Sequence, residues 1–152
     1  NGRMKLQDSG TTLLEIDDAD KVILAGYEAI MNNKEQVLNT IRKCSFTVLP
    51  SIWRDNCPYT VLETMAIGKS IIGSNIGGIP ELVINGETGL IFESSNIEEL
   101  SEKMNLLFES PQLAKKLGEN AKKIANEKYS KDCYYSRIIK IYERLLKEWE
   151  IN

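Results

Sequence analysis

The chain of 152 residues contains no histidine. This absence excludes the serine–histidine and cysteine–histidine nucleophile arrangements and all histidine-containing metal sites. The three cysteines, Cys44, Cys57 and Cys133, are odd in number and widely spaced, without a Cys-x-x-Cys pair. That distribution argues against a disulfide framework or a zinc site and favours a reducing compartment. Any chemistry must therefore rest on carboxylates, hydroxyls, backbone amides or a partner domain.

Long apolar runs and a strong charge of one sign are also missing. No uninterrupted apolar stretch approaches the roughly 20 residues of a membrane span. The formal net charge is only −3 and acids and bases are interleaved, so no nucleic-acid partner is expected. The composition, 42% hydrophobic and 27% charged, is that of an ordinary globular protein. We expect one cytoplasmic domain over residues 1–152. Because the chain does not begin with Met, we expect it to be a fragment of a longer protein.

Short apolar segments alternate with helical patterns up to about residue 95. We expect strands at residues 21–27, Phe46–Pro50, Ser70–Ser74 and Gly89–Phe92, with helices at residues 34–45 and 59–68 between them. Such alternation predicts βαβ units and therefore an α/β fold, a Rossmann-like parallel sheet flanked by helices, over residues 21–95. Residues 1–20 show no clear pattern and form a poorly defined start.

From Asn96 onward only helical patterns occur, which predicts a helical C-terminal segment over residues 96–152. The first of its three helices carries an apolar stripe of Ile97, Leu100, Met104, Leu107 and Phe108. The last carries Tyr135, Ile138, Tyr142, Leu145 and Trp149. A stripe of this kind most often packs into a core. For the last helix, whose stripe is rich in aromatic residues, docking against a second domain is the alternative.

The stretch "WRDNCPYTVLETMAIGKSII", which begins at Trp53, carries the features that suggest chemistry. Pro58 lies in the first helical turn and places the start of a helix near Asn56 or Cys57. A helix start presents unpaired N–H groups and a partial positive charge, which together attract anions. This helix follows a strand of the predicted parallel sheet, and ligands of such sheets bind beyond the carboxyl ends of the strands. The stretch therefore predicts an anion site.

Glu63 lies five residues after Pro58, about 7–8 Å along the helix axis. It falls at the edge of the predicted core stripe, which consists of Val61, Leu62, Met65 and Ala66. From there its carboxylate could accept hydrogen bonds from a diol one turn away from a bound phosphate, as in a ribose joined to a pyrophosphate. Asp55 precedes the helix and would face the other side of the phosphates. The alternative is that both acids are solvated surface residues.

The residues from Val48 to Glu93 resemble the donor-binding half of the family 4 glycosyltransferases, which are retaining enzymes of the GT-B fold. The matching motifs are Pro50-Ser51, Asp55, Glu63, Ala66-Ile67-Gly68, Gly77-Gly78-Ile79-Pro80-Glu81 and the segment from Gly86 to Phe92. The resemblance extends over roughly residues 20–150. The fold class it implies is the C-terminal half of a GT-B glycosyltransferase.

The resemblance implies transfer of a sugar from a nucleotide diphosphate sugar to an acceptor, with retained anomeric configuration. Glu63 would bind the ribose and Asp55 the hydroxyls of the donor sugar, and these two are the candidate catalytic residues. Backbone amides from Cys57 to Val61 would hold the diphosphate, and the loop at Gly26 and Tyr27 would lie near the base. The remaining candidate donor-binding residues are Ser51, Asn56, Cys57, Pro58, Tyr59, Thr60 and Val61. No metal or other cofactor is expected.

The chain departs from the family pattern in two places. Asp55 stands where the family usually has Glu, so the contact of its carboxylate with the donor sugar need not be the one that the family makes. The family's basic residues that clamp the diphosphate lie on an earlier loop, and Arg3 and Lys5 do not match their spacing. An acceptor-binding N-terminal domain would be the partner. Without it, the isolated chain should bind donor weakly and should not turn over. Association with a membrane surface through that missing half stays open.

Three other interpretations of the sequence remain. Asp18-Ala19-Asp20 could bind a divalent metal as a D-x-D motif does in GT-A glycosyltransferases, although a solvated acidic turn is the favoured interpretation. The chain could be a non-catalytic nucleotide-sugar-binding module, or a pseudoenzyme subunit, that works with a partner chain. It could also be an unrelated flavodoxin-like or sensor domain, which would give no reason for the Gly77-Gly78 turn.

Overall fold

A computed structural model describes residues 23–24 and 34–150 of the chain, and its centre is a four-stranded parallel sheet. The strands are β1 (Ile23–Leu24), β2 (Phe46–Leu49), β3 (Ser70–Ser74) and β4 (Gly89–Phe92), in the order β1-β2-β3-β4. Val48 pairs with Ile72, and Ile72 with Leu90. The predicted α/β class and parallel sheet are confirmed, and β2, β3 and β4 begin at the predicted residues.

Six helices are described: α1 (Lys34–Lys43), α2 (Tyr59–Ile67), α3 (Ile79–Leu82), α4 (Ile97–Glu109), α5 (Pro111–Lys128) and α6 (Lys131–Glu150). Local signals set their ends. The N–H group of Gly68, which has a left-handed φ of 86°, donates to the carbonyls of Thr64 and Met65 and ends α2, as is common for a glycine after a helix. Asn96 starts α4, because its side chain accepts a hydrogen bond from the N–H of Glu99.

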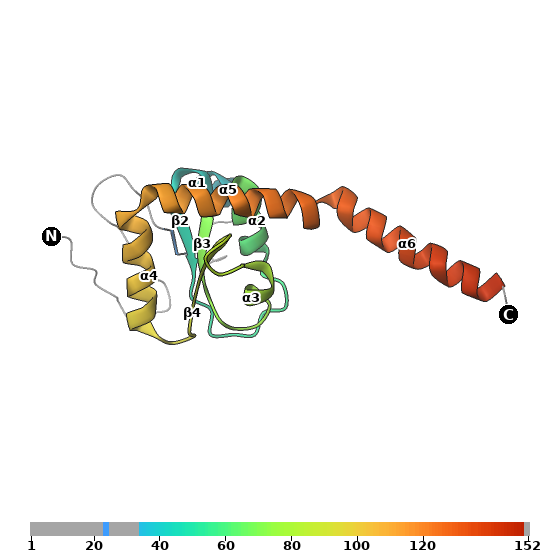
Figure 1. Cartoon of the computed structure of the whole chain (residues 1–152), viewed down its shortest axis with the longest axis horizontal. Helices are drawn as coiled ribbons and strands as arrows, with labels where there is room; N and C mark the ends of the chain where they lie inside the picture. Colours follow the sequence, from blue (N-terminus) through green and yellow to red (C-terminus); the bar gives the residue numbers. More distant parts are fainter. Residues whose placement is uncertain (1–22, 25–33, 151–152) are drawn as a thin grey trace.

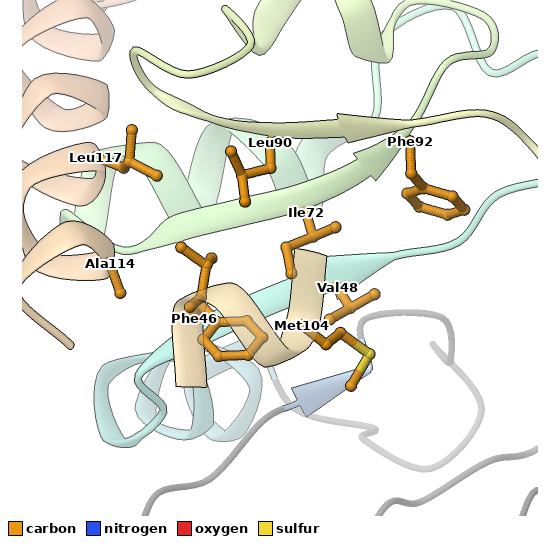
Figure 2. Packing of buried hydrophobic residues seen from close by; sticks show 9 residues of the cluster. Phe46, Val48, Ile72, Leu90, Phe92, Met104, Ala114 and Leu117 are labelled. Carbon is orange, nitrogen blue, oxygen red and sulfur yellow. The ribbon is translucent and has the colours of Figure 1, made fainter. Parts of the chain in front are cut away.

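One face of the sheet is covered by α4 and the first half of α5 (Figure 1). Alternate residues of β2, β3 and β4 point to this face, as the two-residue period of a strand requires. Figure 2 shows Phe46, Val48, Ile72, Leu90 and Phe92 of the strands directed toward Met104 of α4 and toward Ala114 and Leu117 of α5. This cluster is the core on that face of the sheet.

The opposite face is covered by α2 and α3. The crossovers from β2 to β3 and from β3 to β4 advance in the same direction along the sheet, so right-handed connections place both helices on one side. The core there consists of Val61, Met65, Ile71, Ile79, Leu82 and Val83, together with Ala121 and Ala125 from the second half of α5. Since α5 contributes to both cores, it ties the two faces of the sheet together.

Three expected core positions are exposed. Ile97 and Phe108 of α4 face solvent, because only Met104, Leu107 and the partly buried Leu100 reach the sheet. Ala66 of α2 is also exposed. It borders an open groove of about 230 Å³ between α2 and the end of α5. Thr64 is buried in its place, and its hydroxyl lies 3.2 Å from that of Thr47 on β2, which satisfies both polar groups inside the core.

The expectation that the stripe of α6 packs into the core is wrong. In Figure 1, α6 continues away from the sheet beyond the end of α5. None of its described side chains is buried, and Trp149 is 80% exposed. The reason is that α4 and α5 already cover the sheet face that a last helix would need. Within the described ranges, no helix is long and apolar enough to cross a membrane.

Deleting residues 131–152 should change the melting temperature by less than about 3 °C, because ΔΔG of unfolding below about 1 kcal/mol is expected where none of the side chains described there, those of residues 131–149, is buried. Thermal melting followed by circular dichroism measures this. Leu117→Ala is the control, since it truncates a fully buried α5 side chain at an expected cost of about 2–5 kcal/mol. A truncated chain that melts as early as the Leu117→Ala variant would show that α6 stabilises the domain.

Candidate functional site

The carboxyl ends of β2, β3 and β4 meet at one edge of the sheet, and the loop after β2 is fixed there. The hydroxyl of Ser74, at the end of β3, donates to the carbonyl oxygen of Ser51 at 2.8 Å. The hydroxyl of Ser94, just after β4, donates to the same oxygen at 3.3 Å. Residues that follow three neighbouring strands are thus held together at the edge where ligands of parallel sheets bind.

The Gly77-Gly78 turn after β3 lies directly against the loop that carries Asp55. The N–H group of Gly78 donates to the carbonyl oxygen of Asp55 at 2.7 Å. A Cβ atom at Gly77 would lie 2.5 Å from the backbone carbonyl oxygen of Asp55, and one at Gly78 would lie 2.0 Å from the backbone carbonyl oxygen of Asn56. Gly77 also has a φ of 58°. The two glycines are therefore required for the close approach that positions Asp55.

The start of α2 opens at this edge without a side-chain cap. Pro58 is the residue before the helix, with an extended ψ of 112°, and the first turn contains no acidic residue. Pro58 has no N–H group, and the N–H of Val61 donates to the carbonyl of Pro58 at 3.0 Å. The N–H groups of Tyr59 and Thr60 are the ones that a helix start leaves for a ligand. Because these N–H groups point out of the start of the helix, this edge of the sheet favours an anion.

The helix predicted over residues 59–68 does begin at Tyr59, whereas the start inferred from Pro58, near Asn56 or Cys57, is two or three residues too early. A residue that precedes proline is pushed out of the helical region by the proline ring, so Cys57 remains in the loop. Of the expected amides from Cys57 to Val61, Pro58 has no N–H and the N–H of Val61 is bonded to the Pro58 carbonyl, which leaves the N–H groups of Cys57, Tyr59 and Thr60.

Glu63 lies in the second turn of α2 and is joined to α1 by an ion pair. Its Oε1 atom lies 3.5 Å from Nζ of Lys34, the first residue of α1. The Glu63 side chain is 24% exposed and that of Lys34 is 78% exposed. Lys34 was not among the site residues predicted from the sequence. The available signal was a lysine at the start of a helix, where a cation faces the positive end of the helix dipole.

The remaining predicted donor-binding residues differ in how far their side chains are exposed. Asp55, Asn56, Cys57 and Tyr59 are exposed at the edge, and Thr60 is half-buried. The side chains of Pro58 and Val61 are buried, so these two residues can serve a ligand only through their backbone and by shaping the helix start. The hydroxyl of Ser51 is engaged within the loop, where it donates to the carbonyl of Trp53 at 3.0 Å and accepts from the Trp53 N–H at 3.3 Å.

The cysteines are free, as the sequence suggested. Burial raises the pKa of the Cys44 thiol to about 11, and its Sγ donates to the carbonyl of Ile41 at 3.0 Å. The Cys44 thiol is therefore protonated at neutral pH, and the residue is part of the hydrophobic core. Cys57 is exposed in the loop before α2.

Several predicted residues lie outside the described part of the chain. These are Gly26 and Tyr27 near the expected base site, the Asp18-Ala19-Asp20 motif, and Arg3 and Lys5. Among the residues that the structure describes, no group of three or more Cys, Asp or Glu side chains could hold a metal ion. That no metal is needed stays a prediction.

The family model of the group 1 glycosyl transferases matches residues 17–124. The chain is 37% identical over 111 residues to an uncharacterised glycosyltransferase of Methanocaldococcus jannaschii, covering 73% of this chain and 31% of that protein. It is 33% identical over 123 residues to the N,N'-diacetylbacillosaminyl-diphospho-undecaprenol alpha-1,3-N-acetylgalactosaminyltransferase of Campylobacter jejuni, covering 81% and 32%. A solved glycosyltransferase from Rickettsia africae superposes with a TM-score of 0.70 at 29% identity, covering 76% and 31%. The chain thus spans about a third of the length of these relatives.

Proposed function

This chain belongs to the group 1 glycosyl transferases, and from that premise we propose that it is the donor-binding half of a retaining GT-B enzyme of family 4. The proposed reaction transfers a sugar from a nucleotide diphosphate sugar to an acceptor with retained anomeric configuration. The proposed acceptor-binding half corresponds to the part of the relatives that this chain does not span.

One observation carries the proposal: an uncapped helix start at the carboxyl edge of the sheet, followed one turn later by Glu63. The diphosphate accepts hydrogen bonds from the N–H groups of Tyr59 and Thr60. The ribose then lies beside Glu63, which is about 6 Å further along the axis than Tyr59 at about 1.5 Å per residue. A carboxylate has about four lone-pair sites and accepts both hydroxyls of a diol.

The same groups assist the reaction that we propose. Negative charge develops on the diphosphate as the bond to the sugar breaks. The N–H groups and the positive end of α2 already point to where that charge forms, so they stabilise it without rearrangement. The N–H of Gly78 donates to the carbonyl of Asp55 and so holds the backbone there, and the Asp55 carboxylate accepts a hydrogen bond from a hydroxyl of the donor sugar.

Isothermal titration calorimetry of this chain with UDP, GDP and ADP, with their sugar conjugates and with the matching monophosphates tests the proposal. One base series should bind with a Kd of about 0.01–1 mM, the range of typical substrate affinities. The monophosphate of that base should bind at least about tenfold more weakly, because it leaves part of the anion site empty and loses about 1.5–3 kcal/mol of charge-assisted hydrogen bonding. Equal affinity for the two phosphates, or no heat with any nucleotide, would contradict the proposal.

A further inference from the structure

Lys34 has a position that neither helix stability nor fold stability explains. As the first residue of α1 it faces the positive end of the helix dipole, where cations are unfavourable. In the ion pair with Glu63, the side chain of Lys34 is 78% exposed. Exposed ion pairs contribute little to the free energy of unfolding. The pair does join two helices that are distant in the sequence.

We infer that Lys34 is a positioning residue that holds the Glu63 carboxylate in the orientation in which it accepts the ribose hydroxyls. This inference rests on the proposed function. The structure assigns Lys34 to one oxygen, Oε1, from the α1 side. Within the described part of the chain, the Glu63 carboxylate has no other ion-pair or hydrogen-bond partner besides Lys34. A carboxylate held by one oxygen keeps lone-pair sites for both hydroxyls of a diol, and its rotation is restricted before the ligand arrives.

A restrained carboxylate improves binding because fewer rotamers are lost when the ligand binds. Glu has a long side chain with high rotamer entropy, and Glu63 is only partly enclosed by its neighbours. Restricting the side chain in the free protein lowers the entropic cost of binding. This gain in affinity is confined to ligands that contact Glu63. It must therefore depend on the ribose hydroxyls rather than on the phosphates.

The test compares two ligands: the diphosphate of UDP, GDP or ADP that binds most tightly, and its 2′,3′-dideoxy analogue. Calorimetry on Lys34→Ala should show about three- to fivefold weaker binding of the ribonucleotide, the size expected for an exposed charge pair, and no change for the dideoxy analogue. Lys34→Arg should restore most of the loss. Lys115→Ala is the matched control, because Lys115 is also 78% exposed and pairs with Glu119 at 3.9 Å.

Each other outcome overturns the inference in a distinguishable way. An equal loss for both ligands would mean that Lys34 acts on the phosphates through its charge. Unchanged binding of both ligands, with the wild-type chain binding normally, would remove Lys34 from the site and leave the proposed function intact. No binding of any nucleotide to the wild-type chain would overturn the proposed function and this inference with it.

Discussion

Glu63→Ala will weaken binding of the nucleoside diphosphate by about 10- to 100-fold. The substitution removes two hydrogen bonds from ribose hydroxyls to a charged acceptor. Because the Glu63 carboxylate is partly exposed to water, the two bonds together should contribute about 1.5–3 kcal/mol. A loss of about 1.4 kcal/mol is a factor of ten in Kd. Glu63 is partly exposed, so the fold should tolerate the change, and calorimetry on the variant measures the effect directly.

Two comparisons make this result specific to the ribose. Glu119→Ala is the matched control, because Glu119 is also an acid on a helix surface paired with a lysine, at 3.9 Å, and it follows Gly118 of α5, which packs against Gly68 at the other end of α2. The 2′,3′-dideoxy nucleotide should bind Glu63→Ala as well as it binds the wild-type chain. Wild-type affinity of Glu63→Ala for the ribonucleotide would remove Glu63 from the site.

Gly78→Ala will lower stability and donor affinity together. Its Cβ would lie 2.0 Å from the carbonyl oxygen of Asn56, so the turn must move away from the Asp55 loop and the hydrogen bond from the Gly78 N–H to Asp55 is lost. Overpacking of this kind costs about 1–3 kcal/mol, and in a domain of this size that is about 2–12 °C in melting temperature. Because the loop leads into the start of α2, donor affinity should fall at least about tenfold.

Gly86→Ala is the control for Gly78→Ala. Gly86 has a φ of 76° and open space where a Cβ would be, so alanine there adds backbone strain of about 1–2 kcal/mol without a clash. Gly86 lies in the turn before β4, at the opposite end of that strand from the site. The Gly86 variant should melt earlier but keep its donor affinity. If the Gly78 variant also kept its affinity, the contact between the two loops would not position the donor site.

Much of the fold could be predicted because its signals are local. The apolar segments at residues 46–49, 70–74 and 89–92 marked the strands, and Gly68 marked the end of α2. The alternation of strands and helices was sufficient to indicate a parallel sheet. The position of Glu63 one turn into α2 also followed from helix geometry alone.

The buried faces of the helices were less predictable, because burial depends on neighbours that are distant in the sequence. On α2 the polar Thr64 is buried against Thr47, while the apolar Ala66 faces an open groove. Phe108 of α4 shares the apolar stripe of Leu107 but lies beyond the reach of the sheet. A helical pattern shows which residues share a face, but the packing of the other elements determines how much of that face is covered.

Local backbone preferences and periodicity were sufficient to predict the class of the fold, the strands, and a carboxylate one turn beyond a helix start. They could not show that Lys34 reaches Glu63, that Gly78 supports Asp55, or that the apolar stripe of α6 stays uncovered. Each of these depends on which distant segments come into contact. Contacts of that kind arise from the packing of whole elements around the sheet, which no single stretch of the chain encodes.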